Sequence, residues 1–411
     1  MKIAIMGCGT VGMGVFNIIE HSPDMLLRGS RGEALSVKYV LDIKTFEEPE
    51  ITAKQIRDID ILVNDPEIDL VVETMGGLHP AFEFCMKCLE HGKSVVTSNK
   101  LLVSVKGEEL FDAAKAHNAA FRFGAAVCGG MPVVRTLFYG MAANELKGFT
   151  GILNGTSNFV LTKMFRDHMV YADALALAQE RGYAEKDPTD DIEGFDAARK
   201  TAILCSVCFG RHFTPDEIHT EGISAITKAD AEYVSAMHCK IKLLGFGKRL
   251  PDGSVAAGVS PAVISCGDQI AGADGVMNAV RLSGSNVGEL TLFGAGAGRE
   301  ATASAVVADI LNTVRCPGFD AAYYWGKGEN TGVSYLEKEI LRFYVRGCAE
   351  DKNAAKAAIE SALGEVTFLT RENAPENELA FVTGKAPFPT LSAEIDGIEG
   401  LDVGVKIRIY E

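Results

Sequence analysis

Short apolar runs alternate with amphipathic stretches over the first 130 residues. The runs rich in Val, Ile and Ala predict strands, at 1–7, 36–43, 69–75, 94–99 and 119–127. Apolar residues that recur about every 3.6 positions predict helices between them, at 9–21, 79–92 and 107–118. Strands and helices that alternate in this way indicate a parallel, doubly wound sheet of the Rossmann type. We therefore predict an α/β domain over residues 1–130.

The pattern becomes richer in helices after residue 130. Residues 131–293 combine helical stretches with strands at 148–154, 238–248 and 254–265, which is typical of an α+β domain. A further helix at 298–314 follows a run of glycines, and we expect the chain to return at 294–318 to complete the first domain. The middle segment is then expected to be the substrate domain.

The end of the chain forms a third region. Residues 316–330 are rich in Gly and aromatic residues and predict a linker. Residues 330–411 follow the order strand, helix, strand, strand, helix, strand, which indicates a small ferredoxin-like domain.

Composition and charge exclude several classes of protein. Hydrophobic residues make up 47% and charged residues 23% of the 411 residues, an ordinary balance for a globular protein. The net charge of −15 argues against binding to nucleic acids or to anionic membranes. Apolar runs stay shorter than the ~20 residues of a membrane helix, and the first one leads into glycines rather than a signal-peptide cleavage site. We therefore expect a cytoplasmic protein.

The chain has ten cysteines, which are expected to stay reduced in the cytoplasm. Cys85 and Cys88, and likewise Cys205 and Cys208, have the C-x-x-C spacing of zinc ligands. Both pairs lie in helical patterns, where this spacing places two small apolar residues on one buried face. We favour that packing role over a zinc site.

The first predicted strand leads directly into a G-x-G-x-x-G motif formed by Gly7, Gly9 and Gly12, with Thr10 and Val11 between the last two. Glycines are needed there for the tight turn and for close approach of the backbone to a pyrophosphate, which the helix N-terminus then attracts. The alternative is a glycine-rich turn that binds nothing. The strand before and the helix after favour binding of a nicotinamide dinucleotide.

Asp42 is the candidate acidic residue at the end of the second strand. It lies later in the chain than the usual spacing of about 20 residues after the first glycine. Its carboxylate would bind ribose hydroxyls and repel a 2′-phosphate, which favours NAD, whereas Lys44 nearby would soften that preference. NAD and NADP therefore both remain open, as does a solvated Asp42 with no role in binding.

The segment 182–200 is the most unusual in the chain, since six carboxylates lie within the twelve residues 185–196. Asp196 and Lys200 are spaced i,i+4 on the predicted helix that follows, so their side chains emerge on one face. A lysine held there can act as a proton donor to a carbonyl oxygen. Carboxylates can bind a substrate ammonium group. The alternative is an exposed loop with an ordinary surface ion pair.

At this point the sequence resembles the homoserine dehydrogenase family in six separate motifs. They are the glycine loop, Thr97-Ser98-Asn99-Lys100, GGMPVV at 129–134, Asn154-Gly155-Thr156-Ser157-Asn158-Phe159, the acidic segment AEKDPTDDIEGFDAARKTAIL, and Phe293–Gly298 with Thr302–Ala305. These matches occur in the expected order along residues 1 to 315. The resemblance implies NAD(P)-dependent interconversion of L-aspartate 4-semialdehyde and L-homoserine, in threonine and methionine biosynthesis.

The resemblance also implies a role for individual residues. Lys200 would donate the proton to the aldehyde oxygen, and Lys100 would be the second cation near the nicotinamide. Asp196 and Glu185 would bind the substrate, with Glu185 and Asp191 facing its ammonium group. The remaining positions would line the cofactor, at Thr10, Val11, Thr74, Thr97, Ser98, Gly182 and Gly298.

Family members also hold a monovalent cation, such as Na⁺, on backbone carbonyls that would here belong to Val127, Gly129 and Met131. A glutamate that precedes them in some members is Gly124 in this chain. The family forms dimers or tetramers, so the middle domain would also provide the dimer contacts. The C-terminal region resembles an ACT-type regulatory domain in element order, but the usual D-R-P-G-V turn is absent. Effector binding and a packing role both remain open.

Two rival functions use other features of the sequence. A semialdehyde dehydrogenase would use Cys128 as a thiolate nucleophile, which requires a base beside the sulfur. A nicotinamide-binding sensor without catalysis would need no proton donor, and the presence of Lys100, Asp196 and Lys200 argues against it.

Overall fold

The computed structural model describes residues 1–326 and 332–411, and its chain forms two compact units. Unit 1 comprises Met1–Lys147, Ala202–Glu217 and the described residues from Ser283 to Gly326. Unit 2 comprises Gly148–Thr201, Ile218–Leu282 and the described residues from Gly332 to Glu411.

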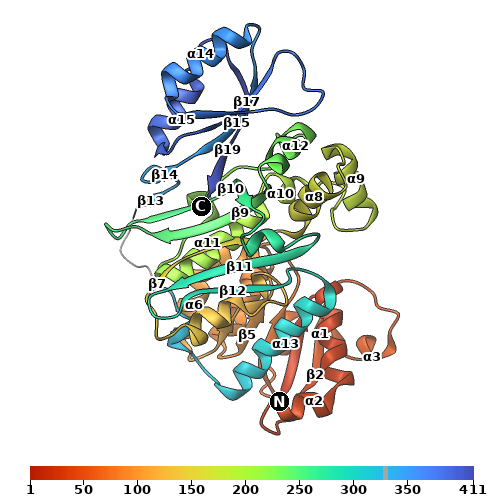
Figure 1. The fold of residues 1–411 in the computed structure, drawn as a ribbon. Coiled ribbons are helices and arrows are strands. Elements are labelled where there is room, and N and C mark those ends of the chain that lie inside the picture. Colours follow the sequence, from red (N-terminus) through yellow and green to blue (C-terminus); the bar gives the residue numbers. More distant parts are fainter. Residues whose placement is uncertain (327–331) are drawn as a thin grey trace. The chain divides into compact units, whose positions relative to one another are not determined.

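Unit 1 contains a parallel sheet with the strand order β3-β2-β1-β4-β5-β6. Strands β2 and β5 of this sheet are labelled in Figure 1. The strands are β1 (Lys2–Met6), β2 (Ser36–Leu41), β3 (Gln55–Ile56), β4 (Ile68–Glu73), β5 (Ser94–Thr97) and β6 (Phe121–Arg122). Because the order reverses between β1 and β4, the loops after these two strands diverge at the carboxyl edge of the sheet, where ligands bind in such folds. The predicted Rossmann-type sheet is confirmed.

Helices of unit 1 pack in two pairs, α1 (Thr10–His21) on α13 (Arg299–Arg315), and α5 (Ala81–Glu90) on α6 (Lys100–Ala116). Right-handed crossovers that run in opposite directions from the centre place helices on both faces of such a sheet. The core on the α1 side joins Ile3 and Ile5 of β1 to Val306 and Ile310 of α13. The remaining elements are α2 (Pro23–Gly29), α3 (Pro49–Thr52), α4 (Ile59–Val63), η1 (Gly124–Ala126), α7 (Val133–Arg135), the π-helical turn η2 (Thr136–Gly140), η3 (Pro215–Glu217), β12 (Gly288–Ala295) and η5 (Ala321–Tyr323).

Two boundaries in unit 1 differ from the sequence prediction. The helix predicted at 107–118 begins at Lys100, because Asn99 caps it: the side-chain oxygen of Asn99 accepts a hydrogen bond of 3.1 Å from Leu102 N. The strand predicted at 119–127 is reduced to β6 and continues as the helical turn η1.

The aromatic residues predicted to form a linker are packed into unit 1 instead. Trp325 is 1% exposed, and its ring lies 4.7 Å from that of Phe111 and 5.0 Å from that of Phe123, in edge-on geometry. Tyr323 is equally buried; its ring lies edge-on to Phe123 at 5.8 Å and stacks on Phe138 at 4.2 Å. Aromatic pairs of this kind contribute beyond their buried area, so this segment stabilises unit 1. The rest of the predicted linker, 327–330, lies outside the described residues.

Unit 2 is built on a long twisted sheet with the strand order β11-β7-β9-β10-β19-β15-β17-β16. Its centre is the antiparallel pair β9 (Cys239–Arg249) and β10 (Val255–Ser265), in continuous register from Cys239 opposite Ser265 to Arg249 opposite Val255. Both strands are almost entirely buried apart from their ends. The flanking strands are β7 (Leu146–Ile152), whose first two residues belong to unit 1, and β11 (Met277–Gly284), whose last two residues do.

Helices of unit 2 pack beside β9, among them α8 (Gly155–Arg166) and α12 (Lys228–Ala236). Helix α11 (Phe195–Phe209) begins in unit 2 and continues into unit 1 after Thr201. The other elements before the C-terminal region are α9 (Tyr171–Glu180), α10 (Thr189–Ile192), β8 (His219–Thr220) and η4 (Ile270–Gly272).

The C-terminal region extends the same sheet through β19 (Asp402–Tyr410), which pairs in parallel with β10 at Ala262 and Arg408. Its other strands are β15 (Phe343–Cys348), β16 (Val366–Leu369) and β17 (Glu378–Thr383), and its helices are α14 (Lys352–Leu363) and α15 (Phe388–Asp396). Val345, Ile359, Phe381 and Ile395 form its core. Three short strands complete it, β13 (Val333–Ser334), β14 (Ile340–Leu341) and β18 (Ala386–Pro387).

No helix in the described residues combines the length and the apolar character that a membrane crossing requires.

The burial of Trp325 leads to a spectroscopic prediction, since this residue is the single tryptophan of the chain. We expect its fluorescence in the native protein to resist quenching by acrylamide and to shift to longer wavelength on unfolding in urea, because the indole lies in an apolar core. Strong quenching before unfolding would contradict the packing described here.

Candidate active site

The glycine motif forms a turn that tolerates no side chain at two positions. Gly7 has a φ of +86°, and a Cβ on it would lie 2.7 Å from Met75. A Cβ on Gly12 would lie 2.1 Å from the carbonyl oxygen of Gly7 and 2.8 Å from Thr74 Oγ1. Thr74 in turn donates a hydrogen bond of 2.5 Å to the Gly7 carbonyl. These glycines therefore allow helix α1 to pack closely against the ends of β1 and β4.

The N-terminus of α1 is suited to binding an anion. Its N-cap is Gly9, which provides no side-chain cap, and a Cβ on Gly9 would meet nothing within 4 Å. The first N–H groups of a helix are not bonded within the helix, and the helix dipole places partial positive charge there. Thr10 and Val11 begin the helix at this point. The turn therefore fits the pyrophosphate of a dinucleotide.

Asp42 lies directly after β2 and contacts this turn. Its Oδ2 accepts a hydrogen bond of 2.7 Å from Cys8 N, and its Oδ1 accepts one of 2.9 Å from Lys44 N. Despite its late position in the sequence, the carboxylate is therefore placed beside the glycine turn. Its binding to a ribose remains a prediction.

A buried carboxyl group that sequence analysis missed joins the ends of β4 and β5. Glu73 is fully buried, and it accepts hydrogen bonds of 2.5 Å from Thr97 Oγ1 and 2.8 Å from Met75 N. Burial raises the pKa of Glu73, and these hydrogen bonds oppose the shift. An acid at the end of an apolar strand is the signal that could have identified it. Glu73 fixes the loop that carries Thr74.

The 97–100 motif forms the start of α6. Asn99 donates a hydrogen bond of 2.6 Å to the Gly77 carbonyl, and its backbone N–H donates one of 2.9 Å to Thr97 Oγ1. Ser98 and Lys100 are half-buried, with Lys100 as the first residue of the helix. Unit 1 thus brings Thr74, Thr97 and Ser98 to the carboxyl edge of its sheet, and their contact with a cofactor remains a prediction.

In unit 2, the i,i+4 pair of the acidic segment is a buried ion pair rather than a surface pair. Lys200 Nζ lies 2.7 Å from Asp196 Oδ2, and the two side chains are 10% and 4% exposed. Lys200 also donates a hydrogen bond of 2.7 Å to the Leu153 carbonyl. The exposed pair of this segment is a different one, between Asp190 and Arg199 at 2.6 Å.

Asn154 connects these groups, although the sequence analysis named it only as part of a motif. Its side-chain nitrogen donates hydrogen bonds of 2.6 Å to Asp191 and 2.9 Å to Asp196. Its side-chain oxygen caps α8 by accepting a hydrogen bond of 2.8 Å from Ser157 N. An Asn at a helix N-cap was the available signal. Unit 2 therefore assembles Asp191, Asp196 and Lys200 around Asn154.

Glu185 and Gly182 take no part in the hydrogen bonds of this cluster. Both are exposed in the loop before α10, and Gly182 has a φ of +71°. Within the described residues, the Glu185 carboxylate makes no hydrogen bond or ion pair, although its backbone carbonyl accepts a hydrogen bond of 3.1 Å from Gln179. The structure thus leaves this carboxylate on the surface of the loop.

The predicted cation site falls on a tight turn of unit 1. Val127, Gly129 and Met131 belong to a turn in which two consecutive residues have left-handed backbone conformation. These are Cys128, at φ +57°, and Gly129 itself, at φ +47°. A Cβ on Gly124 would lie 2.8 Å from Asp309 Oδ2, so the Asp309 carboxylate fills the space that a glutamate side chain would need at position 124.

The last two positions singled out in unit 1 are Cys128 and Gly298. Cys128 is fully buried, so an aldehyde substrate cannot reach its sulfur, as a thiolate mechanism would require. Gly298 is the N-cap of α13, with a φ of +114°.

The cysteines of both C-x-x-C pairs are buried on helices, Cys85 and Cys88 on α5 and Cys205 and Cys208 on α11. Burial raises the pKa of Cys85 well above its usual value and that of Cys88 to about 12, so both thiols are held in the protonated form. Among the described residues, no group of three or more His, Cys, Asp or Glu side chains converges as metal ligands do.

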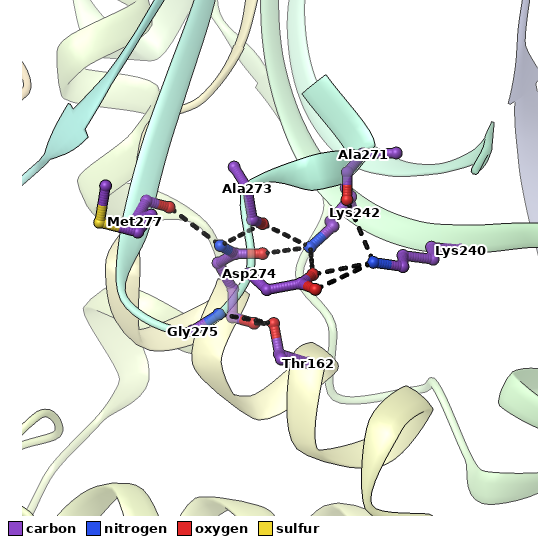
Figure 2. A network of polar contacts seen from close by, with 9 residues as sticks. Thr162, Lys240, Lys242, Ala271, Ala273, Asp274, Gly275 and Met277 are labelled. Carbon is purple, nitrogen blue, oxygen red and sulfur yellow. Dashed lines mark hydrogen bonds and ion pairs between the residues drawn. The ribbon is translucent and has the colours of Figure 1, made fainter. Parts of the chain in front are cut away.

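A second buried polar network lies elsewhere in unit 2 (Figure 2). Lys242 donates hydrogen bonds of 2.8 Å to Asn158 Oδ1 and 2.7 Å to the Ala273 carbonyl, and its Nζ lies 3.1 Å from Asp274. Figure 2 shows Lys240 approaching the same Asp274 carboxylate, 3.0 Å from each oxygen. One carboxylate thus serves two ammonium groups. Burial lowers the pKa of Lys242 to about 8, and Asp274 opposes part of that shift.

Comparisons with known proteins assign both the N-terminal and the middle part of the chain to one family. A family model described as "Homoserine dehydrogenase, NAD binding domain" matches residues 7–124, and one described as "Homoserine dehydrogenase" matches residues 132–311. A homoserine dehydrogenase of Pseudomonas aeruginosa is 42% identical over 77% of this chain and 72% of its own length.

Solved structures give the same result. The crystal structure of a homoserine dehydrogenase from Thiobacillus denitrificans has a TM-score of 0.90 and 33% identity, covering 100% of this chain and 98% of that one. A hyperthermophilic archaeal homoserine dehydrogenase in complex with NADPH has a TM-score of 0.65 and 28% identity, covering 77% of this chain and 98% of its own.

Lys242 gives a prediction about stability and pH. The unfolded chain keeps the ordinary pKa of 10.5, so between pH 8 and pH 10.5 the unfolded state binds more protons than the folded state. The free energy of unfolding of the wild type, relative to Lys242→Met, should therefore rise with pH across this window, by on the order of 3 kcal/mol. Urea unfolding at several pH values measures this difference.

The matched control is Lys248→Met, on the same strand but exposed and paired with Glu339. Its free energy of unfolding should change with pH by the same amount as that of the wild type between pH 8 and pH 10.5. A Lys242→Met protein that also runs parallel to the wild type would contradict the buried ammonium.

Proposed function

The chain belongs to the homoserine dehydrogenase family of NAD(P)-dependent oxidoreductases, and from this premise we propose which of its residues carry out the reaction. The family activity interconverts L-aspartate 4-semialdehyde and L-homoserine. Reduction of the aldehyde adds a hydride to its carbon and a proton to its oxygen. The nicotinamide supplies the hydride when it is bound, so the protein must provide the proton.

We propose that Lys200 donates this proton and that it removes the hydroxyl proton in the reverse direction. The observation that carries the proposal is the geometry of its ammonium group, fixed 2.7 Å from both Asp196 Oδ2 and the Leu153 carbonyl. A proton donor held in one position contributes on the order of 10²- to 10⁴-fold to the rate. Asp196 is the positioning partner, because it is itself held by Asn154.

The substrate also carries an ammonium group, for which the acidic segment is suited. We assign this role to Glu185 together with Asp191 and Asp196. Glu185 is exposed in its loop, and its charge is not balanced by a cation within the described residues. A carboxylate in that state can bind a cationic ligand without first losing another partner.

For the cofactor, we propose that the turn of Gly7, Gly9 and Gly12 holds the pyrophosphate and that Asp42 lies on the ribose side. Lys100 would act as the cation near the nicotinamide. The remaining lining positions are Thr10, Val11, Thr74, Thr97, Ser98, Gly182 and Gly298. Absorbance of the reduced nicotinamide, with L-homoserine and either NAD or NADP, measures the preference that Asp42 and Lys44 leave open.

We further propose a monovalent cation such as Na⁺ on the carbonyls of Val127, Gly129 and Met131, since neutral oxygens suit a hard cation of low charge. Replacing Na⁺ with a bulky organic cation at equal ionic strength should then lower the melting temperature of the protein as well as its activity.

The C-terminal region is proposed to be an ACT-like domain in a dimeric or tetrameric enzyme. Its sheet order β19-β15-β17-β16 corresponds to strands four, one, three and two of its own chain order, as in ferredoxin-like folds. Sedimentation measures the oligomeric state.

The role of Lys200 predicts the effect of its replacement. Lys200→Ala should lower kcat by about 10²- to 10⁴-fold and leave cofactor affinity unchanged, because the substitution removes the proton donor and leaves the glycine turn intact. Steady-state kinetics and titration with reduced cofactor measure the two quantities. The control is Arg199→Ala, which alters the neighbouring half-buried cation and should keep kcat within a few-fold of the wild type. Near-normal turnover of Lys200→Ala would show that another group donates the proton.

The role of Glu185 predicts a different kinetic effect. Glu185→Ala should raise KM for L-homoserine by about 10- to 100-fold with a smaller change in kcat, because a charge-assisted contact to the substrate is lost. Glu180→Ala, which removes an exposed carboxylate from α9, is the matched control and should leave KM unchanged. An unchanged KM in Glu185→Ala would assign ammonium binding to Asp191 and Asp196 alone.

A further inference from the structure

A cavity of about 260 Å³ lies within unit 2, where β19 and α15 meet β8 and β10. Its walls include Tyr335, Phe343 and Phe388. The centroid of the Phe388 ring lies 5.6 Å from that of Tyr335 and 6.1 Å from that of Phe343. Charged side chains complete the lining, at His219, Glu221, Glu337, Lys406 and Arg408. None of these residues belongs to the groups assigned above to catalysis.

Arg408 is the unusual member of this lining. It is 8% exposed, and its Nε donates a hydrogen bond of 3.0 Å to Ser260 Oγ. Its Nη2 is buried and has no hydrogen-bond partner among the described residues. Its guanidinium lies 4.7 Å from the ring centroid of Phe246 and 5.9 Å from that of Tyr410. Within the described residues it makes no ion pair, and Glu221 and Glu339 act on its charge only from beyond ion-pair distance.

Other buried or half-buried cations nearby are neutralised. Arg346 binds both oxygens of Asp230, at 2.7 and 3.0 Å. Lys406, which shares the cavity wall with Arg408, binds both oxygens of Asp396, at 2.7 and 2.8 Å. Arg408 therefore differs from its neighbours in carrying a buried charge that no carboxylate of the described residues contacts directly.

A buried guanidinium without an anion is unfavourable unless something compensates for its lost hydration. Burial lowers the pKa of Arg408, but arginine does not lose its proton in proteins, so the charge persists at neutral pH. A guanidinium N–H donates a strong, charge-assisted hydrogen bond to a carboxylate. The cavity next to it provides the space in which such a group could bind.

We propose that this cavity binds a small organic monocarboxylate, with its carboxylate on Arg408 and its apolar body against Tyr335, Phe343 and Phe388. Glu221 and Glu337 on the walls disfavour a second negative charge on the ligand. The volume corresponds to about nine water molecules at ~30 Å³ each, which limits the ligand to a small molecule. The site is separate from the proposed active site in its residues and does not depend on the proposed function.

The test uses three probes of the same shape, measured by calorimetry on the full-length protein. These are 3-methylbutanoate, its neutral counterpart 3-methylbutanol, and L-leucine, which adds an ammonium group. We expect the acid to bind with a Kd on the order of 1 mM and the alcohol to bind at least about tenfold more weakly. Tighter binding of L-leucine would identify the ligand as an amino acid held also by Glu221 or Glu337. Equal binding of acid and alcohol, or no binding of either carboxylate, would overturn the proposal.

Variants locate the site. Arg408→Met should weaken binding of the acid by about 30-fold or more, because the paired charge is lost, while turnover with L-homoserine shows that the variant is folded. The matched control is Arg342→Met, whose guanidinium is exposed and already paired with Glu411. It should bind the acid as the wild type does. Unchanged affinity in Arg408→Met would refute the assignment.

If Arg408→Met does not fold, a second variant can test the same position for the carboxylate. Glu337→Gln removes an exposed acid from the cavity wall and leaves Arg408 in place. It should strengthen binding of 3-methylbutanoate by about two- to fivefold, because a nearby like charge is removed. Weaker binding would contradict the proposed position of the carboxylate.

Discussion

The buried contact between Lys200 and Asp196 is the constraint around which this part of unit 2 is organised. Two charges removed from water are unfavourable unless their geometry is good and further hydrogen bonds satisfy them. Here the Leu153 carbonyl completes the environment of the ammonium, and Asn154 that of the carboxylate. Because Asn154 also caps α8 and contacts Asp191, the strand end, the helix start and the acidic segment are fixed together. The ion pair thus fixes the positions of Leu153 and Asn154 as well as those of Lys200 and Asp196.

In unit 1, the corresponding constraint is the close approach of two backbones at the glycine turn. Gly7 and Gly12 remove side-chain bulk where two backbones meet, and the uncapped start of α1 presents N–H groups. The turn is held from outside by Asp42 on Cys8 and by Thr74 on Gly7. Glu73, buried beneath this loop, fixes it through Thr97 and Met75. Polar groups that support the loop are therefore as important to its shape as the glycines are.

Buried charges elsewhere in unit 2 fall into two kinds. Lys242 has its hydrogen-bonding capacity met by Asn158, Ala273 and Asp274, which is typical of a group that specifies packing. Arg408 has a hydroxyl and aromatic neighbours but no directly bonded carboxylate among the described residues, and it lines a cavity. The difference in how these two cations are satisfied is what distinguishes a structural network from a candidate binding site.

The sequence alone determined the Rossmann-type sheet, the glycine turn and the pairing of Asp196 with Lys200, because each depends on short-range spacing that a helix or strand converts directly into geometry. It did not reveal that this pair is buried, that Asn154 joins it, or that Glu73 lies beneath the cofactor loop. It also misread the aromatic segment that contains Trp325 as a linker. These features depend on contacts between residues distant along the chain, Leu153 with Lys200 or Phe111 with Trp325. Burial and partner choice are properties of the packed chain, so only the tertiary structure could decide them.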